Sequence, residues 1–193
     1  MSTATDIVGR GNAEGARLFK EWFGELGQAA DEGRGAAYVF VMGSLAELLR
    51  CFDFPIVFPE INSLQTAVRH VAHDYLNEAE DYGYSPDICG YVKADVATQL
   101  RGWTLPMGRI PPPGIAVYTN ACNTYIKWAE IWERLHKIPL FTHDVPGTRQ
   151  GGLITLGVTL WVGKAARRAM REAASAQASR AAATTTSAQG AAV

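Results

Sequence analysis

The stretch Ala36-Ala37-Tyr38-Val39-Phe40-Val41-Met42 is a continuous apolar run that is rich in β-forming residues. A strand with one wet face alternates apolar and polar residues, whereas a run without alternation is typical of a strand buried on both faces. Shorter apolar runs of the same kind occur at residues 56–58, 115–118 and 138–141. Together these runs predict the strands of a parallel sheet that has helices on both sides.

Helical patterns separate these runs. In residues 13–26, five large apolar side chains fall on one stripe of an amphipathic helix. Ser44 and Glu47 match a capping box for a short helix that begins at Leu45. Alternating strands and helices indicate an α/β protein, and we predict a Rossmann-like or flavodoxin-like layer fold with a short, mostly parallel sheet flanked by helices. Further helices are expected at residues 62–77, 88–100 and 124–136.

Composition and charge change near Gln150. The first 149 residues carry 13 basic and 18 acidic side chains, whereas the remaining 44 carry five basic side chains and one acidic. Alanine accounts for 13 of those 44 residues, which is too little apolar bulk to offset the entropy of ordering them. We expect four segments: a flexible N-terminus at 1–12, an α/β domain at 13–149, a weakly ordered segment at 150–172 and a disordered Ala/Ser/Thr tail at 173–193.

The overall composition is that of an ordinary globular protein with a net charge of −1. Three cysteines are too few for a disulfide scaffold, and the first residues lack the apolar core of a signal peptide. The longest apolar run, residues 153–162, is shorter than the roughly 20 residues that span a membrane. The sequence has no phosphate-binding loop and no basic stripe. We therefore expect a cytoplasmic protein that binds neither nucleic acid nor membrane.

Two cysteines lie where an extended segment gives way to a predicted helix. Cys89 follows the loop at residues 84–88, and Cys122 follows the strand at 115–118. A thiolate at a helix N-terminus is stabilised by the helix dipole and by unpaired N–H groups, so it can hold a metal or cluster. The separation of 33 residues matches no zinc motif, and the alternative is that both are buried small hydrophobes. That alternative suits Cys51 better still.

Histidines give a weaker signal. His70 and His73 lie three residues apart on a predicted helix, but no carboxylate spacing completes a zinc site. We interpret both as solvated or packing side chains. His143 and Asp144 end the last predicted strand, at the edge where parallel sheets bind ligands. They form either a catalytic pair or a polar turn, and Cys122 is expected at the same edge.

Five sequence blocks carry a family resemblance: residues 43–49 (GSLAELL), 58–62 (FPEIN), 85–93 (SPDICGYVK), 119–128 (TNACNTYIKW) and 138–146 (IPLFTHDVP). These blocks resemble the benzoyl-CoA reductase and 2-hydroxyacyl-CoA dehydratase family. The similarity runs from about residue 13 to residue 149. It corresponds to the N-terminal half of family subunits that are about twice as long as this chain.

The resemblance implies a [4Fe-4S] cluster that is held by three cysteines of each subunit. Cys89 and Cys122 match the first two ligand positions, so they are the expected cofactor-binding and metal-binding residues of a cluster-binding domain. Cys51 falls outside the ligand motifs. The third ligand of the family comes from a later C-terminal half, and no cysteine follows Cys122 in this sequence. No catalytic residue is assigned.

The resemblance also implies radical chemistry on an acyl-CoA substrate. In the ATP-dependent reductases, ATP-hydrolysing activator subunits drive a low-potential electron into clusters on two related subunits. The aromatic ring of benzoyl-CoA is then reduced during anaerobic aromatic degradation. We therefore expect an iron–sulfur subunit of an oxidoreductase, whose partners are a related cluster-binding subunit, the activator and an aromatic or 2-hydroxy acyl-CoA.

Two alternatives stay open. The protein could belong to a 2-hydroxyacyl-CoA dehydratase, in which the same type of radical expels a 2-hydroxyl group as water. It could also be a catalytically inactive truncated fragment, because the third ligand is missing. Composition, charge and family likeness all change near Gln150. We hypothesise that the chain beyond it is a frameshifted or misassembled continuation, and sequencing the locus tests this.

Overall fold

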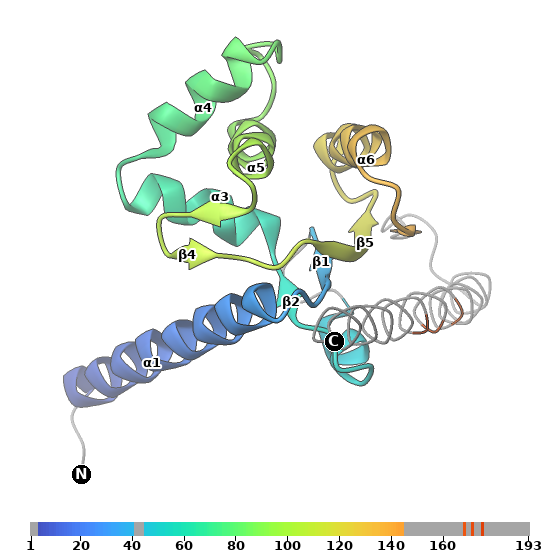
Figure 1. Cartoon of the computed structure of the whole chain (residues 1–193). Helices are drawn as coiled ribbons and strands as arrows, with labels where there is room; N and C mark the ends of the chain where they lie inside the picture. The colour runs from blue at the N-terminus through green and yellow to red at the C-terminus, as the bar shows by residue number, and fades with distance from the viewer. Residues whose placement is uncertain (1–3, 41–44, 145–167, 169–170, 172–174, 176–193) are drawn as a thin grey trace, which may run out of the picture.

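The centre of the protein is a four-stranded parallel sheet (Figure 1). The computed structural model describes residues 4–40 and 45–144, with the single positions 168, 171 and 175. The strand order β2-β1-β5-β6 corresponds to the first four strands of the flavodoxin-like arrangement, once a separate hairpin is set aside. This confirms the predicted α/β layer fold. The strands are β1 (Ala36–Val39), β2 (Ile56–Val57), β5 (Pro113–Thr119) and β6 (Leu140–His143), and all their pairings are parallel.

Six helices and a short hairpin surround this sheet in the described part of the chain. The hairpin pairs β3 (Thr104–Leu105) with β4 (Gly108–Arg109) in antiparallel fashion. The helices are α1 (Ala4–Asp31), α2 (Ala46–Arg50), α3 (Pro59–Val68), α4 (Ala72–Asp81), α5 (Gly90–Leu100) and α6 (Asn123–Leu135). The hairpin lies between α5 and β5, within residues 102–113, which contain four prolines.

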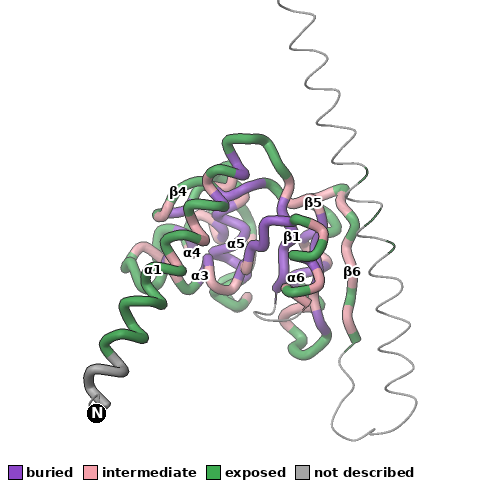
Figure 2. The backbone as a smooth tube through the Cα atoms, turned by 90° about the horizontal axis from the view of Figure 1, so that it is seen from below, coloured by how far each residue is buried: buried purple, intermediate pink, exposed green. Residues whose placement is uncertain are grey.

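Alternate residues of β1 bury opposite faces of the sheet, as its unbroken apolar run predicts. On one face Tyr38 and, just beyond the strand, Phe40 pack on Trp132 of α6, with ring centroids 4.9 and 5.1 Å apart. On the other face, Val39 shares a smaller core with Leu49 of α2. Figure 2 shows the buried segments concentrated in β1, β5 and the helices beside them. Because both faces are covered, all four residues of β1 are buried.

Helix α1 is longer than the sequence predicts. It begins at Ala4 and not at residue 13, so it includes most of the segment 1–12 that we expected to be flexible. Only its C-terminal part is buried: Leu26 is fully covered, whereas Leu18 is 52% exposed. Figure 1 shows the N-terminal part extending away from the sheet.

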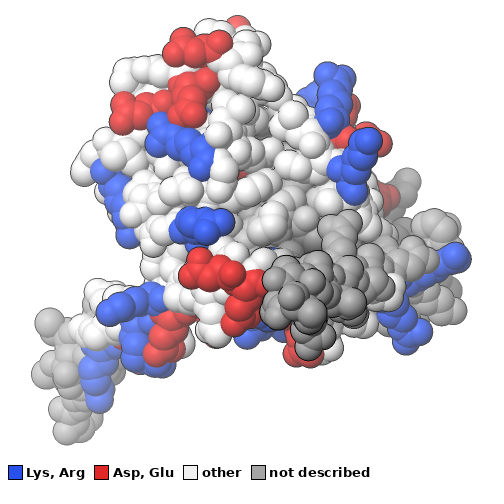
Figure 3. All heavy atoms as spheres, viewed as in Figure 1, with Lys and Arg blue, Asp and Glu red and all other residues white. Residues whose placement is uncertain are grey.

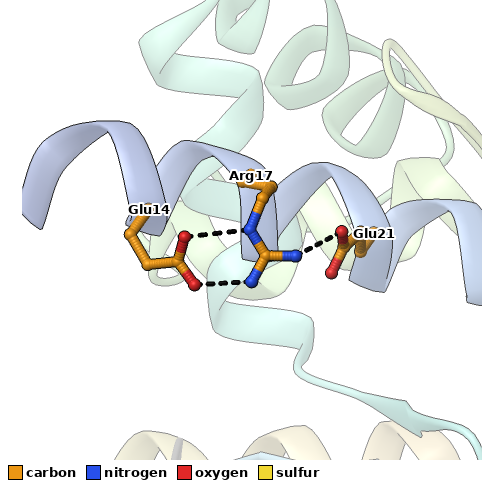
Figure 4. Close-up of polar contacts among 3 residues, drawn as sticks. All are labelled: Glu14, Arg17 and Glu21. Carbon is orange, nitrogen blue, oxygen red and sulfur yellow. Dashed lines mark hydrogen bonds and ion pairs between the residues drawn. The ribbon is translucent and has the colours of Figure 1, made fainter. Parts of the chain in front are cut away.

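The exposed part of α1 has its own ion pairs. The Arg17 guanidinium donates to Glu14 at 2.9 and 2.5 Å and to Glu21 at 2.5 Å (Figure 4). These residues are three and four apart, the spacing at which side chains on one helix meet. The pairs therefore stabilise the helix itself and do not hold it to the rest of the protein.

The single helix expected at residues 62–77 is wrong. The structure has α3 and α4 there, separated by His70, whose φ of 59° lies in the left-handed region and ends α3. The start differs as well, because α3 begins at Pro59, where a missing N–H costs nothing. Asn62 and Ser63, at the expected start of the helix, are buried residues inside α3.

The helix expected to begin at Leu45 begins one residue later, at Ala46. The residue before α2 is Leu45, which has a φ of 56° and makes no side-chain cap hydrogen bond. Ser44, which was expected to form the capping box with Glu47, lies outside the described residues, as do nearly all of the segments 150–172 and 173–193. No helix in the described ranges is long and apolar enough to cross a membrane.

Helix α4 carries the most acidic surface in the view of Figure 3. One of its side chains, Glu78, accepts a hydrogen bond at 2.6 Å from Arg101, which follows α5. The Arg101 guanidinium also lies 3.8 Å from the ring centroid of Tyr75. These contacts join α4 to the C-terminal end of α5.

A buried lysine joins the same two helices further along. Lys93 of α5 is 6% exposed, and its Nζ donates to Glu80 Oε1 at 2.5 Å and to the Pro86 carbonyl at 2.9 Å. Through these two bonds it holds the end of α4 and the segment that leads into α5. A buried ammonium without partners costs several kcal/mol, so the pairing is needed for α5 to pack here.

Lys93→Met is therefore expected to lower the free energy of unfolding by about 1–3 kcal/mol, since it removes both hydrogen bonds and leaves the Pro86 carbonyl without its donor. Urea unfolding of the full chain measures this. The matched control is Lys127→Met, which removes a lysine that is 75% exposed and paired with Glu130. That change is expected to cost less than about 0.5 kcal/mol. Equal losses in the two variants would contradict the structural role of Lys93.

Candidate metal centre

Helices α5 and α6 lie side by side and run in the same direction. Asp95 Oδ2 of α5 accepts hydrogen bonds from the indole nitrogens of Trp128 and Trp132, at 2.8 and 2.7 Å. One turn further along α5, Gln99 Oε1 lies 2.9 Å from His136 Nε2, at the end of α6. Contacts that advance by one turn on both helices require parallel axes, and Figure 1 shows both helices nearly end-on.

This parallel arrangement brings the two candidate cysteines to the same end of the helix pair. Cys89 is the N-cap of α5 and lies six residues before Asp95, whereas Cys122 is the N-cap of α6 and lies six residues before Trp128. At 1.5 Å per residue, each cysteine is about 9 Å along its helix from the Asp95–Trp128 contact. The matched offsets place both thiols at the same end of the helix pair.

All three cysteines are exposed. The alternative that Cys89 and Cys122 are buried small hydrophobes is therefore wrong, and so is the same expectation for Cys51. The Cys51 thiol donates to the Glu47 carbonyl, 3.3 Å away in its own helix. The sequence did not show that Cys51 is exposed, because its apolar neighbours suggested a buried position. In the structure Cys51 lies at the C-terminal end of α2, where Leu49 is the buried residue.

Tyr125 connects the two cysteines electrostatically. Its hydroxyl donates to Glu60 Oε1 at 2.5 Å. Burial, this hydrogen bond and the negative charge of Glu60 raise the pKa of Tyr125, and the charges of Cys122 and Cys89 raise it further. Both thiolates therefore act on the same phenolic oxygen. No sequence pattern indicated this group, because Glu60 and Tyr125 are 65 residues apart.

The surroundings of Cys122 favour the thiolate. A hydrogen bond from the Thr124 hydroxyl is the main cause that lowers the pKa of Cys122, and the N–H groups of Thr124 and Tyr125 add to it. Backbone N–H groups in the first turn of a helix have no partner within the helix, so they are available to an anion. The start of α6 thus acts as the sequence analysis expected of a helix N-terminus.

A cavity of about 500 Å³ opens beside Cys89, between the start of α5 and the length of α6. Ile88 and Val92 give its wall an apolar part. Charged side chains of both signs also line it: Asp87, Lys127, Glu130 and Arg134. An apolar cavity with a few charged groups is the usual form of a small-molecule site.

The other sequence candidates do not join this group. His70 lies in the turn after α3 and His73 lies within α4, so they share no helix face. Asp144 accepts a hydrogen bond from Asn120, which joins the ends of β6 and β5 as a polar turn would. The neighbouring His143 has a buried Nδ1 without a hydrogen-bond partner among the described residues.

Cys89 and Cys122 fit part of a cluster site. Both are accessible, both begin a helix, and the Cys122 thiol is biased toward the thiolate form that binds metal. The described residues contain no group of three or more His, Cys, Asp or Glu side chains that could hold a metal ion. The pair therefore offers two thiolate donors and leaves further ligands to come from elsewhere.

Comparison with known proteins identifies the family. The sequence model of the 2-hydroxyglutaryl-CoA dehydratase D-component family matches residues 43–185, and the chain belongs to this family. The B subunit of benzoyl-CoA reductase from Thauera aromatica is 34% identical over 118 residues, which are 60% of this chain and 27% of that protein. The (R)-phenyllactyl-CoA dehydratase alpha subunit of Clostridium sporogenes is 28% identical over 100 residues, 52% of this chain and 25% of the relative.

A third relative, the (R)-2-hydroxyisocaproyl-CoA dehydratase alpha subunit of Clostridioides difficile, is 28% identical over 130 residues, 66% of this chain and 31% of that subunit. The chain thus matches about a quarter to a third of the length of these curated relatives. The family match continues to residue 185, well past Gln150. We expected the likeness to end at Gln150, and the match does not support that boundary.

Thr124→Val should slow the alkylation of Cys122 by iodoacetamide at pH 7 severalfold. The substitution removes the hydroxyl that does most to lower the pKa of Cys122, so less of the reactive thiolate is present at that pH. The rate–pH profile should move to higher pH. Peptide mass spectrometry after timed alkylation gives the rate at each cysteine separately, and Cys51 in the same sample is the internal control. An unchanged profile at Cys122 would contradict the assigned hydrogen bond.

Proposed function

We propose that Cys89 and Cys122 are two ligands of a [4Fe-4S] cluster, in an iron–sulfur subunit of the ATP-dependent benzoyl-CoA reductase type. The observation that carries this proposal is that α5 and α6 run in the same direction and each begins at an exposed cysteine, which supports two thiols at the same end of the helix pair. Membership of the family and the similarity to a benzoyl-CoA reductase subunit support it.

Residues of this chain would stabilise the bound group in three ways. The Thr124 hydroxyl and the first N–H groups of α6 donate to the Cys122 sulfur, and such donors tune the potential of a cluster. The Tyr125 hydroxyl donates to Glu60, whose negative charge raises the pKa of Cys122, and this hydrogen bond partly offsets that charge. The cavity next to Cys89 gives a partly apolar place for the acyl part of a thioester. When bound, the cluster would supply low-potential electrons one at a time to the acyl-CoA substrate.

Two cysteines do not complete the coordination of a four-iron cluster. The remaining ligands would come from outside the described residues, from a partner chain, a small thiol or the substrate. In this proposal the partners are a related cluster-binding subunit and ATP-hydrolysing activator subunits, and the setting is cytoplasmic anaerobic aromatic degradation.

A 2-hydroxyacyl-CoA dehydratase subunit is the second candidate. It is favoured by the family itself and by two of the relatives named above, which are dehydratase alpha subunits. The scaffold and the two thiols would serve both reactions. Assays of the complete enzyme on benzoyl-CoA and on 2-hydroxyacyl-CoA thioesters separate the two candidates. The third candidate, a catalytically inactive fragment, is tested by cluster assembly.

Anaerobic reconstitution of the full chain with ferrous iron, sulfide and dithiothreitol tests the ligands. We expect the wild-type chain to bind iron and sulfide in equal amounts, and both Cys89→Ser and Cys122→Ser to lose most of it, because each removes one of two thiolate donors. Iron and sulfide analysis after gel filtration gives the amounts.

Cys51→Ser is the matched control for these variants, since it also removes an exposed thiol that caps the end of a helix. It should load as much iron as the wild-type chain. Failure of the wild-type chain to take up iron and sulfide would favour the inactive fragment. Loss of loading in Cys51→Ser to the same degree as in the other two variants would refute the assignment of ligands.

A further inference from the structure

Asp95 is an unusual residue for the middle of a packed helix. Its carboxylate is on α5, is only 3% exposed, and carries a charge where both neighbouring positions are apolar and buried. Its Oδ2 atom accepts three hydrogen bonds, from Trp128 and Trp132 at 2.8 and 2.7 Å and from Gln99 at 2.7 Å. Two of these donors belong to the neighbouring helix, α6.

Burying this carboxylate has a cost that apolar packing would avoid. Burial raises the pKa of Asp95 to about 6, although the hydrogen bonds from Trp128, Trp132 and Gln99 act in the opposite direction. A leucine at this position would carry no desolvation cost. It would also leave two buried indole N–H groups without an acceptor. The carboxylate adds a geometric restraint that apolar packing lacks, because three hydrogen-bond donors must all point at one oxygen atom.

The carboxylate joins two helices that pack mainly on different elements, and the Gln99–His136 contact joins them again one turn further along. Helix α6 is fixed to the sheet, since Trp128 and Trp132 pack on Phe40 at centroid distances of 4.8 and 5.1 Å. Helix α5 packs instead on α3 and α4. The converging bonds at Asp95 therefore fix how far α5 can slide or rotate against α6.

Any such movement would be transmitted to the cysteines. Cys89 lies six residues before Asp95, and Cys122 lies six residues before Trp128, which is hydrogen-bonded to Asp95. A helix is stiff over a turn and a half, so a shift of α5 at Asp95 appears as a similar shift at its N-cap. We propose that Asp95 is a positioning residue, which sets the distance between the Cys89 and Cys122 sulfurs by fixing the register of α5 against α6. As a statement about cluster ligands, this rests on the proposed function.

The test measures the sulfur spacing without a cluster. The full chain carrying Cys51→Ser is treated with dibromobimane, a short reagent that becomes fluorescent when it bridges two nearby thiols. The bridging rate is divided by the iodoacetamide rate of the same thiols, which removes differences in simple reactivity. Asp95→Leu is expected to lower this ratio by at least about fivefold, since unpaired indole N–H groups disfavour the native register.

Asp95→Asn should stay within about twofold of the parent ratio, because the amide oxygen can accept the same three bonds. Thr98→Val is the matched control. It alters a buried polar residue of α5 whose hydroxyl bonds within the helix, to the Ala94 carbonyl at 2.8 Å, so it should leave the ratio unchanged. If Asp95→Leu does not fold, as judged by circular dichroism, the double substitution Trp128→Phe and Trp132→Phe keeps aromatic packing and removes both donors. It should lower the ratio in the same way.

A parent-like ratio in folded Asp95→Leu, or in the double variant where Asp95→Leu does not fold, would overturn the positioning role. So would absence of bridging in the parent chain, or an equal fall of the ratio in Thr98→Val. Iron and sulfide uptake is measured on the same proteins as a separate result. If bridging depends on Asp95 as expected but the wild-type chain takes up no iron, the positioning role is supported and the proposed function is refuted.

Discussion

Burial of β1 on both faces is the constraint on which the rest of the structure depends. An uncovered face of this strand would expose Tyr38 or Val39, which are fully buried here, so helices must lie on both sides of the sheet. All three strand pairings in this sheet are parallel, so each connection between neighbouring strands has to cross back over the sheet. The carboxyl ends of β1, β5 and β6 then meet at one edge, and the reversal of strand order between β1 and β5 makes that edge the expected binding site. Cys122 begins the helix that follows β5 at this point.

Cys89 reaches the same region by a different route. The element before α5 is helix α4 and not a strand of the sheet, so α5 is placed by its packing on α3 and α4 and by the Lys93 bonds to Glu80 and Pro86. The two thiols therefore belong to helices that pack on different elements. The indole rings of Trp128 and Trp132 reach from α6 to α5. Hydrogen bonds at Asp95 join these two helices, and in the proposed positioning role this buried carboxylate would set how the two thiols lie relative to each other.

Sequence patterns predicted the features that depend on local chemistry. The unbroken apolar run indicated β1, and the transitions from an extended segment to a helix indicated that Cys89 and Cys122 lie at helix N-termini. The break between α3 and α4 was missed because His70 adopts a left-handed turn that no Gly or Pro announces. The Glu60–Tyr125 bond was missed because only the folded chain joins its partners. Asp95 did leave a signal, since a lone acid between buried apolar residues usually has a buried partner.

The uneven support of α1 has a consequence for how the chain opens. Trp22 holds the second half of this helix through a bond to the Ile56 carbonyl at 2.9 Å, whereas Leu18 before it is half exposed. A helix segment whose described side chains are mostly exposed relies largely on weak intrinsic helix stability, so its amides are expected to exchange with solvent before those of the core. Proteases should nick the chain there first, and the sheet and both cysteine-bearing helices would survive the cut intact.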